Sequence, residues 1–378
     1  MKIVYCIGSL AIPGGAERVL VNKANFLAEH FNFEVHILIA DQGSLPVCYK
    51  LNKKVKVRDL QIKNKIAPSG IPLVSFYKNI QILKPIYKSI IEKIKPDVVL
   101  VLERGYEDFI VPELHLGIPV IRESHSSYMA SIIIDQNKGS LRGQLTGKFF
   151  TYLYKQQMKK YDKVVLLTEE DKRDRTYLRN TCVIPNTINC FGEKISSLKN
   201  KKAISVGRLD INKNFKDQIL IWEEVVKTHP AWTLHIYGEG PERENLQNLI
   251  SVKNLERNVF LEGVTTKIEE KYRESSFFIF TSVAEGFGMV LVEAMQCGLP
   301  VISFNCPCGP ADIIEDGKNG FLVNTGDLHT FKKRSIDLIE NEKLRIDLGR
   351  NAVIRSKDYL PEVVMPQWIA LFKELQNE

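Results

Sequence analysis

The sequence contains no run of residues that is long and apolar enough to cross a bilayer. No window of its 378 residues reaches about 18 uncharged apolar residues, the shortest length typical of a transmembrane helix. Met1 leads directly into the strand-like residues 2–7, without a basic start and a long apolar core. No secretory signal peptide is therefore predicted. These absences argue against an integral membrane protein and favour a cytoplasmic one.

Cysteine is scarce, and its spacing differs from that of metal-binding or disulfide-rich proteins. The chain has seven cysteines, an odd number without zinc-type spacing, and a single residue separates Cys306 from Cys308. We therefore expect reduced thiols in the core or in loops, and no metal site.

The chain also lacks the G-x-G-x-x-G spacing of dinucleotide-binding proteins, which disfavours a nicotinamide-dependent oxidoreductase. The loop that joins strand-like residues 2–7 to a helix predicted at 16–30 ends in Gly14-Gly15 instead. Such a pair allows the backbone to approach a bulky or charged ligand. An ordinary pair of loop glycines remains the alternative.

Strand-like and helical segments alternate along the whole chain. In the first half, strands are predicted at residues 2–7, 34–40, 55–62, 97–102, 118–122 and 163–167, with helices at 16–30 and 77–95. In the second half, strands are predicted at 203–206, 233–237, 259–262 and 277–280, with helices at 215–228, 243–253 and 289–297. This alternation predicts two doubly wound parallel sheets, with ligands at the carboxyl ends of the strands.

The chain is too long for a single core, so we expect separate domains. The first is predicted at residues 1–186 and the second, which starts with a linker at 187–200, at residues 187–357. The tail, residues 358–378, is amphipathic and predicts a docking helix with Val364, Trp368, Leu371 and Phe372 on its apolar side.

Positive charge is concentrated in the first half of the chain. Residues 1–186 carry 28 Lys and Arg against 18 Asp and Glu, whereas residues 187–378 carry 24 against 27. This asymmetry favours an anionic partner for the first half: a membrane surface, a nucleic acid or a phosphorylated substrate. Residues 138–163 interleave basic and aromatic side chains, which fits either a lipid-contacting helix or a solvated cationic face. Nucleic acid is disfavoured because no recognised binding motif accompanies the charge.

Several strand ends in the second half carry residues suited to a diphosphate. Gly207 and Arg208 follow the strand at 203–206, Lys213 comes five residues later, and Gly238 follows the strand at 233–237. Arg208 offers a planar fork of donors, and Lys213 offers a mobile point charge. Their position after strand ends favours a binding role over that of ordinary surface cations.

The segment 282–293 has the features of an anion site. A strand turns through Gly286 and Gly288 into a helix, which presents free backbone N–H groups and the positive end of the helix dipole. Glu285 lies in the turn, and Glu293 lies within the helix. Phosphate at the helix start and hydroxyl groups near the carboxylates would fit a sugar nucleotide. An ordinary strand–turn–helix with surface glutamates is the alternative.

In the first half, His125 is the histidine that we select as a site candidate. It lies in a polar cluster directly after the strand at 118–122, where ligands of parallel sheets bind.

In their order along the chain, these motifs resemble a family-4 glycosyltransferase of the GT-B fold, of the type that builds bacterial surface polysaccharides. The carrying residues are Gly14-Gly15-Ala16-Glu17, His125, Gly207-Arg208-Leu209, Lys213-Asn214, Gly238-Glu239-Gly240-Pro241 and Glu285-Gly286-Phe287-Gly288 with Glu293. The resemblance implies two Rossmann-like domains that face a central cleft, with the acceptor held mainly by the first and the nucleotide sugar by the second. It also implies that the last helix crosses back onto the first domain.

The resemblance also implies a role for each motif residue. Arg208 and Lys213 would bind the donor diphosphate, and Glu293 would hold the ribose hydroxyl groups. Glu285 would hold the transferred sugar, and His125 would lie near that sugar. The remaining donor-binding residues would be Gly15, Gly207, Gly238, Val264, Gly286, Phe287, Gly288, Met289 and Val290.

The expected enzyme retains the anomeric configuration and needs neither a metal nor another cofactor. Consistent with this, the sequence has no D-x-D triplet, the metal–diphosphate ligand of the other large glycosyltransferase fold. No protein nucleophile is evident, so we favour a front-face displacement. A glycosidase would use Glu285 and Glu293 as its two carboxylates but would leave Arg208 and Lys213 without a role. A nucleotide-sugar epimerase and a non-catalytic module that binds sugar nucleotides are the rival hypotheses.

The donor and the acceptor are less closely defined. Residues 305–310 look like a segment seen in family members that use UDP-hexoses or UDP-N-acetylhexosamines, and GDP-mannose is the alternative donor. The basic first half agrees with a glycan acceptor on a polyprenyl diphosphate. We therefore expect a cytoplasmic hexosyltransferase associated peripherally with the anionic inner face of the plasma membrane.

Overall fold

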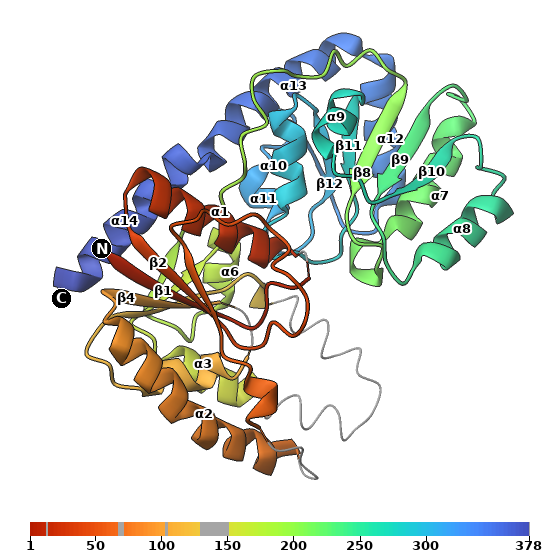
Figure 1. Cartoon of the computed structure of the whole chain (residues 1–378). Helices are drawn as coiled ribbons and strands as arrows, with labels where there is room; N and C mark the ends of the chain where they lie inside the picture. The colour runs from red at the N-terminus through yellow and green to blue at the C-terminus, as the bar shows by residue number, and fades with distance from the viewer. Residues whose placement is uncertain (13, 67–71, 103–104, 129–150, 378) are drawn as a thin grey trace. The chain divides into compact units, whose positions relative to one another are not determined.

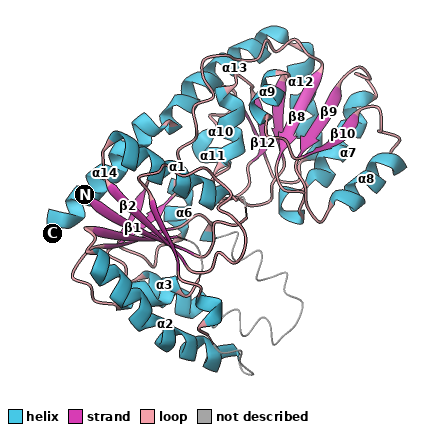
Figure 2. Ribbon diagram, in the orientation of Figure 1, coloured by secondary structure: helices cyan, strands magenta, loops and turns pink. Residues whose placement is uncertain are grey.

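The computed structural model describes residues 1–12, 14–66, 72–102, 105–128 and 151–377 (Figure 1). The chain forms two compact units. Unit 1 comprises Met1–Thr187 and Val364–Glu378, and unit 2 comprises Ile188–Val363. Each unit contains its own sheet with helices on both faces (Figure 2).

The described part of unit 1 contains a seven-stranded parallel sheet in the order β3-β2-β1-β4-β5-β6-β7. Its strands are β1 (Lys2–Ile7), β2 (Glu34–Ile39), β3 (Lys56–Asp59), β4 (Val98–Leu102), β5 (Val120–Glu123), β6 (Lys163–Leu166) and β7 (Thr181–Val183). Its helical segments are α1 (Gly15–His30), η1 (Ile62–Asn64), α2 (Pro72–Ile94), α3 (Glu107–Ile110), η2 (Val111–Glu113), α6 (Glu169–Asp174) and most of α14 (Pro361–Asn377).

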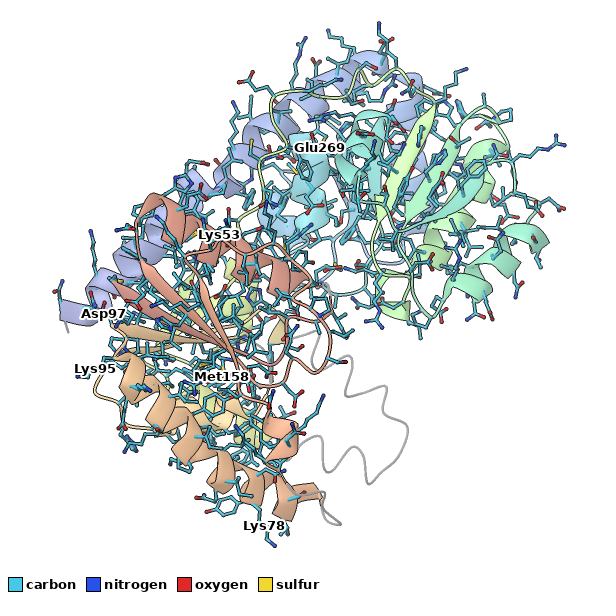
Figure 3. All side chains as sticks on the ribbon, viewed as in Figure 1. Lys53, Lys78, Lys95, Asp97, Met158 and Glu269 are labelled. Carbon is cyan, nitrogen blue, oxygen red and sulfur yellow. The ribbon has the colours of Figure 1, made fainter. Side chains whose placement is uncertain are left out.

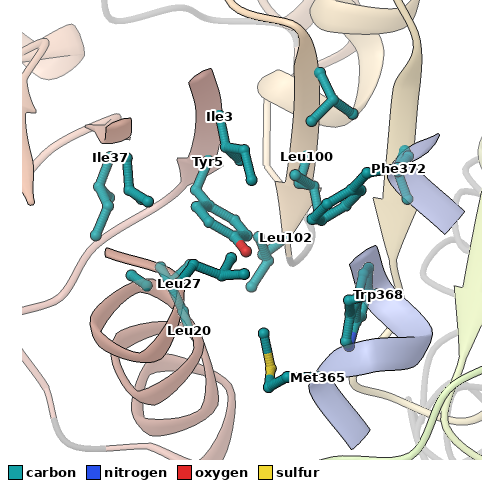
Figure 4. Close-up of a cluster of buried hydrophobic side chains, with 14 of the residues drawn as sticks. Ile3, Tyr5, Leu20, Leu27, Ile37, Leu100, Leu102, Met365, Trp368 and Phe372 are labelled. Atoms are coloured by element: carbon teal, nitrogen blue, oxygen red, sulfur yellow. The ribbon is translucent and has the colours of Figure 1, made fainter. Parts of the chain in front are cut away.

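The C-terminal helix α14 completes the core on one face of the unit 1 sheet. Because side chains alternate along a strand, Tyr5 of β1 points to this face together with Leu100 of β4. Met365, Trp368 and Phe372 of α14 pack into the same cluster (Figure 4). The return of the last helix to the first unit confirms this part of the fold prediction.

A second cluster covers the opposite face of the same sheet. Val4 and Cys6, the neighbours of Tyr5, point to this face and pack with Tyr87 of α2. Met158, labelled in Figure 3, is buried in this cluster. The sheet is therefore buried on both faces, as expected of a parallel sheet with crossover helices.

The second sheet, in unit 2, has six parallel strands within the described residues, in the order β10-β9-β8-β11-β12-β13. The strands are β8 (Lys202–Val206), β9 (Thr233–Tyr237), β10 (Val259–Gly263), β11 (Phe277–Phe280), β12 (Val301–Phe304) and β13 (Gly320–Val323). The helical segments are η3 (Ile211–Lys213), α7 (Phe215–Val226), α8 (Arg243–Val252), α9 (Ile268–Arg273), α10 (Met289–Gln296), α11 (Pro310–Ile313), α12 (Leu328–Glu340), α13 (Glu342–Ser356) and η4 (Lys357–Tyr359).

The prediction of two doubly wound parallel sheets is confirmed, and the differences from it are local. The strand expected at residues 55–62 ends at Asp59, because Gln61 adopts a left-handed conformation with φ +50° and starts η1. The helix expected at residues 77–95 begins earlier, at Pro72, and contains Pro85. Strands β7 and β12 and helices α6, α9, α12 and α13 had no counterpart in the prediction.

Within the described residues, every helix is too short or too polar to span a bilayer. Cys306 and Cys308 are buried in unit 2, in agreement with the expectation of thiols in the core or in loops.

Candidate functional site

The carboxyl ends of four neighbouring strands carry most of the predicted donor-binding residues. Strands β10, β9, β8 and β11 are consecutive in the parallel sheet of unit 2, so their carboxyl ends lie at one edge. Gly207 and Arg208 follow β8, Gly238 follows β9, and Val264 follows β10. The segment 281–288 joins β11 to α10. This edge is where open α/β sheets bind their ligands.

Lys213 and Glu285 form an ion pair at this edge. The Lys213 Nζ atom donates a hydrogen bond to Glu285 Oε1 over 2.5 Å, and it lies 5.5 Å from the centroid of the Phe280 ring. Both side chains are only slightly exposed. The structure thus brings together a cation and a carboxylate that the sequence placed on separate strand ends.

Backbone hydrogen bonds fix the position of this pair. Asn212 Nδ2 donates to the Ala284 carbonyl over 2.8 Å, and the Val283 N–H donates to the Asn212 carbonyl over 2.9 Å. The Glu285 N–H donates to the Pro307 carbonyl over 3.1 Å. Asn212 and Pro307 therefore hold the turn that carries Glu285, although no motif identified either of them as a site residue.

Arg208 has a different environment from Lys213. Its side chain is 73% exposed, and its ion-pair contact within the described residues is Asp210, with Nε 4.0 Å from Oδ2. A pair at that distance and exposure constrains a guanidinium weakly. Arg208 therefore keeps its planar set of donors available for an oxyanion.

The start of helix α10 presents backbone donors. Gly288 precedes the helix in a left-handed conformation with φ +93°, and Leu291 N–H donates back to its carbonyl. Within the described part of the chain, the N–H groups of Met289 and Val290 have no hydrogen-bond acceptor. Free N–H groups and the helix dipole together favour an anion at this position. Gly286 lies two residues before Gly288 in the same turn.

Glu293 is buried, so it is not the surface glutamate of the alternative interpretation. It is 4% exposed on α10, and the Tyr272 hydroxyl of α9 donates to its Oε2 atom over 3.2 Å. The hydroxyl holds the carboxylate in a defined position. Tyr272 is a further residue that sequence reasoning missed, because nothing local links it to Glu293.

A close backbone contact explains one glycine of the predicted site. Gly238 has φ +146°, and a Cβ atom there would lie 1.8 Å from the Gly207 carbonyl oxygen. The Gly238 N–H also donates to the Gly263 carbonyl at the end of β10. Only glycine allows these strand ends to approach so closely. Val264, directly after Gly263, is largely exposed.

Phe287 contributes differently from the other predicted donor-binding residues. Its ring is buried and packs edge-on against Tyr359, with centroids 5.5 Å apart. A Cβ atom at Gly309 would lie 2.0 Å from the Phe287 carbonyl oxygen. The ring of Phe287 therefore anchors the turn to the core of unit 2, and its carbonyl packs closely against Gly309. Nearby, burial and the Glu285 carboxylate raise the pKa of the Cys306 thiol.

The two predicted site residues of unit 1 occur in different local settings. Gly15 is the first residue of α1, preceded by Gly14 in an extended conformation. His125 follows β5, and its Nε2 atom lies 3.2 Å from Glu123 Oε1. The other carboxylate oxygen of Glu123, Oε2, accepts a hydrogen bond of 2.6 Å from Lys23 Nζ. Burial alone would raise the pKa of Glu123, but Lys23 and His125 outweigh it and lower that pKa to about 2.

The basic segment at residues 138–163 is only partly described, because residues 138–150 lie outside the described ranges. In the described part, Lys155 Nζ lies 4.8 Å from the centroid of the Tyr128 ring and Lys160 pairs with Glu113. These two cations thus have partners within unit 1. The predicted contact with anionic lipid stays a prediction.

Within the described ranges, no group of three or more His, Cys, Asp and Glu side chains is arranged to hold a metal ion. The expectation of a metal-free reaction stays a prediction as well.

Comparison with known proteins identifies the class. Residues 191–355 match the family model "Glycosyl transferases group 1". The chain is 29% identical over 378 residues to the amylovoran biosynthesis glycosyltransferase AmsD of Erwinia amylovora, covering 97% of this chain and 98% of that protein. It is 25% identical over 369 residues, or 94% of each chain, to the N-acetylgalactosamine-N,N'-diacetylbacillosaminyl-diphospho-undecaprenol 4-alpha-N-acetylgalactosaminyltransferase of Campylobacter jejuni.

A solved structure shows the same fold. The S. aureus TarM G117R mutant, in complex with fondaparinux, alpha-GlcNAc-glycerol and UDP, aligns with a TM-score of 0.77 at 18% identity. The alignment covers 98% of this chain and 99% of that one. The two Rossmann-like units thus have the GT-B fold. The chain is a glycosyltransferase, and its residues 191–355 are similar to the group 1 glycosyltransferases.

Proposed function

We propose that the protein transfers a hexose or N-acetylhexosamine from a UDP-sugar to a lipid-linked glycan, with retention of the anomeric configuration, in the synthesis of a bacterial surface polysaccharide. The observation that carries the proposal is the cluster of Arg208, the Lys213–Glu285 pair and the free N–H groups of α10 at one edge of the unit 2 sheet. These groups suit a diphosphate attached to a sugar.

The diphosphate is the part of the donor that these groups recognise. Lys213 supplies a point charge, Arg208 supplies a planar fork, and the N–H groups of Met289 and Val290 supply backbone donors. Breaking the bond between the anomeric carbon and the diphosphate increases the negative charge on the leaving oxygen. Groups that stabilise this charge where it develops accelerate the reaction, and losing one such donor typically costs about 100- to 1,000-fold in turnover.

The two glutamates take different roles because their surroundings differ. Glu293 is buried and held by the Tyr272 hydroxyl, which suits a fixed acceptor for ribose hydroxyl groups. Glu285 is paired with Lys213 and lies in the turn before α10, which suits a carboxylate that contacts the sugar when the diphosphate engages Lys213.

The proposed step is a front-face displacement. The bond from the anomeric carbon to the phosphate oxygen breaks, and a bond to the acceptor hydroxyl oxygen forms on the same face. The proton of the acceptor hydroxyl passes to the leaving phosphate oxygen, so UDP and the new glycoside are the products. Arg208 and Lys213 supply the positive charge, and the step as proposed uses no metal.

Three of the comparisons support the choice of donor, pathway and acceptor. TarM was solved with UDP, and AmsD is named for the biosynthesis of amylovoran. The name of the Campylobacter enzyme includes a diphospho-undecaprenol acceptor. An acceptor of this class would bring the protein to an anionic membrane surface, in agreement with the positive charge of residues 1–186. Binding to anionic vesicles that weakens sharply with salt would support this association, and equal binding to neutral vesicles would contradict it.

A transfer assay tests the proposed function. The protein is incubated with UDP-glucose, UDP-galactose, UDP-N-acetylglucosamine, UDP-N-acetylgalactosamine or GDP-mannose, with and without undecaprenyl-diphosphate-linked saccharides. We expect UDP release and an α-linked product with one UDP-sugar and only with acceptor. Conversion of the donor alone into its epimer would indicate an epimerase, and GDP-mannose as the sole donor would overturn the choice of nucleotide. Donor binding without transfer to any acceptor would indicate a non-catalytic binding module.

A further inference from the structure

Unit 1 contains a line of three buried titratable side chains that the proposed reaction leaves unexplained. Lys23 of α1 donates to Glu123 at the end of β5 over 2.6 Å, and Glu123 lies 3.2 Å from the Nε2 atom of His125. The side chains of Lys23 and Glu123 are each 1% exposed, and that of His125 is 5% exposed. The line therefore connects the interior of the unit to the loop after β5.

Stability alone does not account for the Lys23–Glu123 pair. Removing two charges from water is costly for each ion, and apolar residues of similar volume in place of a buried pair are often neutral or stabilising. Burial lowers the pKa of Lys23, because removal from water disfavours the charged ammonium. A pair at such a cost suggests a role beyond stability.

The last helix holds the cationic end of this line. Lys23 Nζ lies 3.5 Å from the centroid of the Trp368 ring of α14 and 5.7 Å from that of Tyr5. Figure 4 shows Trp368 and Tyr5 within the core that α14 completes. The two aromatic faces stabilise the ammonium and restrict its position. Helix α14 thus fixes Lys23, and Lys23 fixes one oxygen of the Glu123 carboxylate.

The other carboxylate oxygen of Glu123, Oε1, lies close to the Nε2 atom of His125. The 3.2 Å contact is an ion-pair distance without the alignment of a hydrogen bond, and within the described residues Nε2 has no aligned acceptor. A carboxylate at this distance stabilises a proton on Nε2 and leaves Nδ1 as the nitrogen with the lone pair in the neutral ring.

We infer that Lys23 and Glu123 are positioning residues, which hold the imidazole of His125 in one orientation and in the Nε2–H tautomer for the transfer reaction. This inference rests on the proposed function, because His125 needs a sugar-transfer step in which to act. It gives the C-terminal helix a second role, since the Trp368 ring restrains the lysine that restrains the carboxylate.

The test combines Glu123→Gln, Lys23→Met and the double variant K23M/E123Q with His125→Ala. Glu123→Gln alone leaves a buried lysine unpaired, so this variant loses stability in urea unfolding. The double variant removes both charges and recovers stability relative to Glu123→Gln. We expect kcat to stay reduced by about tenfold or more in the double variant, as for other residues that orient a functional histidine, with little change in donor KM.

Two further measurements separate positioning from structure. In the His125→Ala background, Glu123→Gln should lower kcat no further, because its effect passes through the imidazole. Long-range ¹H–¹⁵N spectra of histidine-labelled protein should show the Nε2–H tautomer of His125 in the wild type and a mixture in Glu123→Gln. Glu34→Gln is the matched control: it removes a carboxylate 2.9 Å from His36 Nε2 and should change the His36 signal without changing kcat or His125.

The inference is overturned if the double variant recovers kcat together with stability. It is also overturned if the losses from Glu123→Gln and His125→Ala are additive, or if the His125 tautomer is the same with and without Glu123. A wild-type protein that transfers no sugar would contradict the proposed function instead. The tautomer measurement would then still decide whether Glu123 positions the imidazole.

Discussion

Lys213 Nζ lies 2.5 Å from Glu285 Oε1, although the two residues are 72 positions apart in the chain. The pair neutralises a cation at the edge of the sheet where a diphosphate is proposed to bind. An incoming diphosphate would compete with Glu285 for Lys213 and would release the carboxylate toward the sugar. In the proposed site, the ion pair would thus link recognition of the phosphate to recognition of the sugar.

Replacing Glu285 with Gln should separate binding of the diphosphate from transfer of the sugar. Without the carboxylate, the charge of Lys213 is no longer neutralised, so UDP should bind up to about tenfold more tightly, a change of about 1.4 kcal/mol. Turnover of the UDP-sugar should fall at the same time. Calorimetry with UDP and steady-state kinetics measure the two quantities. Glu224→Gln, which removes the partner of Lys227 on the surface, is the control and should change neither. Weaker UDP binding in Glu285→Gln would contradict the competition.

Replacing Tyr272 with Phe should weaken nucleotide binding. The change removes the hydroxyl that donates to Glu293 Oε2, and one hydrogen bond contributes roughly 1 kcal/mol, or about fivefold in affinity. We expect the Kd for UDP to rise by about this factor and kcat at saturating donor to change little. Tyr359→Phe removes a hydroxyl that donates to the Asp312 carbonyl and serves as the control. Equal effects of the two substitutions on UDP affinity would contradict a specific role for Tyr272.

Adding one methyl group at Gly238 should disrupt the edge of the unit 2 sheet. The new Cβ would lie 1.8 Å from the Gly207 carbonyl oxygen, so the ends of β8 and β9 must separate. Overpacking of this kind typically costs about 1–3 kcal/mol, and we expect UDP affinity to fall together with stability. Gly326→Ala is the matched control, because its φ is also positive and no atom lies within 4 Å of the new Cβ. Thermal unfolding that is equal for both variants would show that the close approach is unimportant.

Because Glu123 is buried and paired, we expect the free energy of unfolding to decrease in acid in a way that depends on this residue. Its pKa is lowered to about 2 from the ordinary 4.5, so the stability that its ionised form contributes is present above about pH 4.5 and is lost as the pH falls toward 2. The difference in unfolding free energy between wild type and Glu123→Gln should be largest near pH 7, at about 3–5 kcal/mol for a broken buried pair, and should shrink below pH 4.5. Urea unfolding between pH 7 and pH 3 measures it. A difference that stays constant over this range would show that the pKa of Glu123 is the same in the folded and in the unfolded protein, which would contradict a lowered pKa.

The sequence was sufficient to predict the two parallel sheets, apart from strands β7 and β12, and the residues at several strand ends. Parallel strands place their carboxyl ends at one edge, so Arg208, Lys213 and Gly238 could be assigned to that edge from their position after predicted strands. The conformation of Gln61 was not predictable, because glutamine has no particular preference for the left-handed region.

Contacts between distant elements explain what the sequence did not reveal. Tyr272 and Glu293 lie on different helices, and only tertiary packing brings the hydroxyl to the carboxylate. Lys23 did carry a signal, because it lies on the apolar face of α1 between Val19 and Leu27, where a lysine needs a partner. That partner, Glu123, lies 100 residues away and could not be identified without the fold.

Titration calorimetry with UDP tests most directly whether the edge of the unit 2 sheet binds a nucleoside diphosphate. The proteins to compare are the wild type, Arg208→Ala, Lys213→Ala and Lys216→Ala. Lys216 is an exposed lysine of α7, three residues after Lys213, and serves as the matched control. We predict that UDP binds the wild type and Lys216→Ala alike and that GDP binds the wild type more weakly than UDP does. Arg208→Ala and Lys213→Ala should each lower the affinity for UDP at least about tenfold, as expected for the loss of one charge-assisted contact to phosphate. Wild-type affinity in both Arg208→Ala and Lys213→Ala, or no binding of UDP to the wild type, would contradict the proposed donor site.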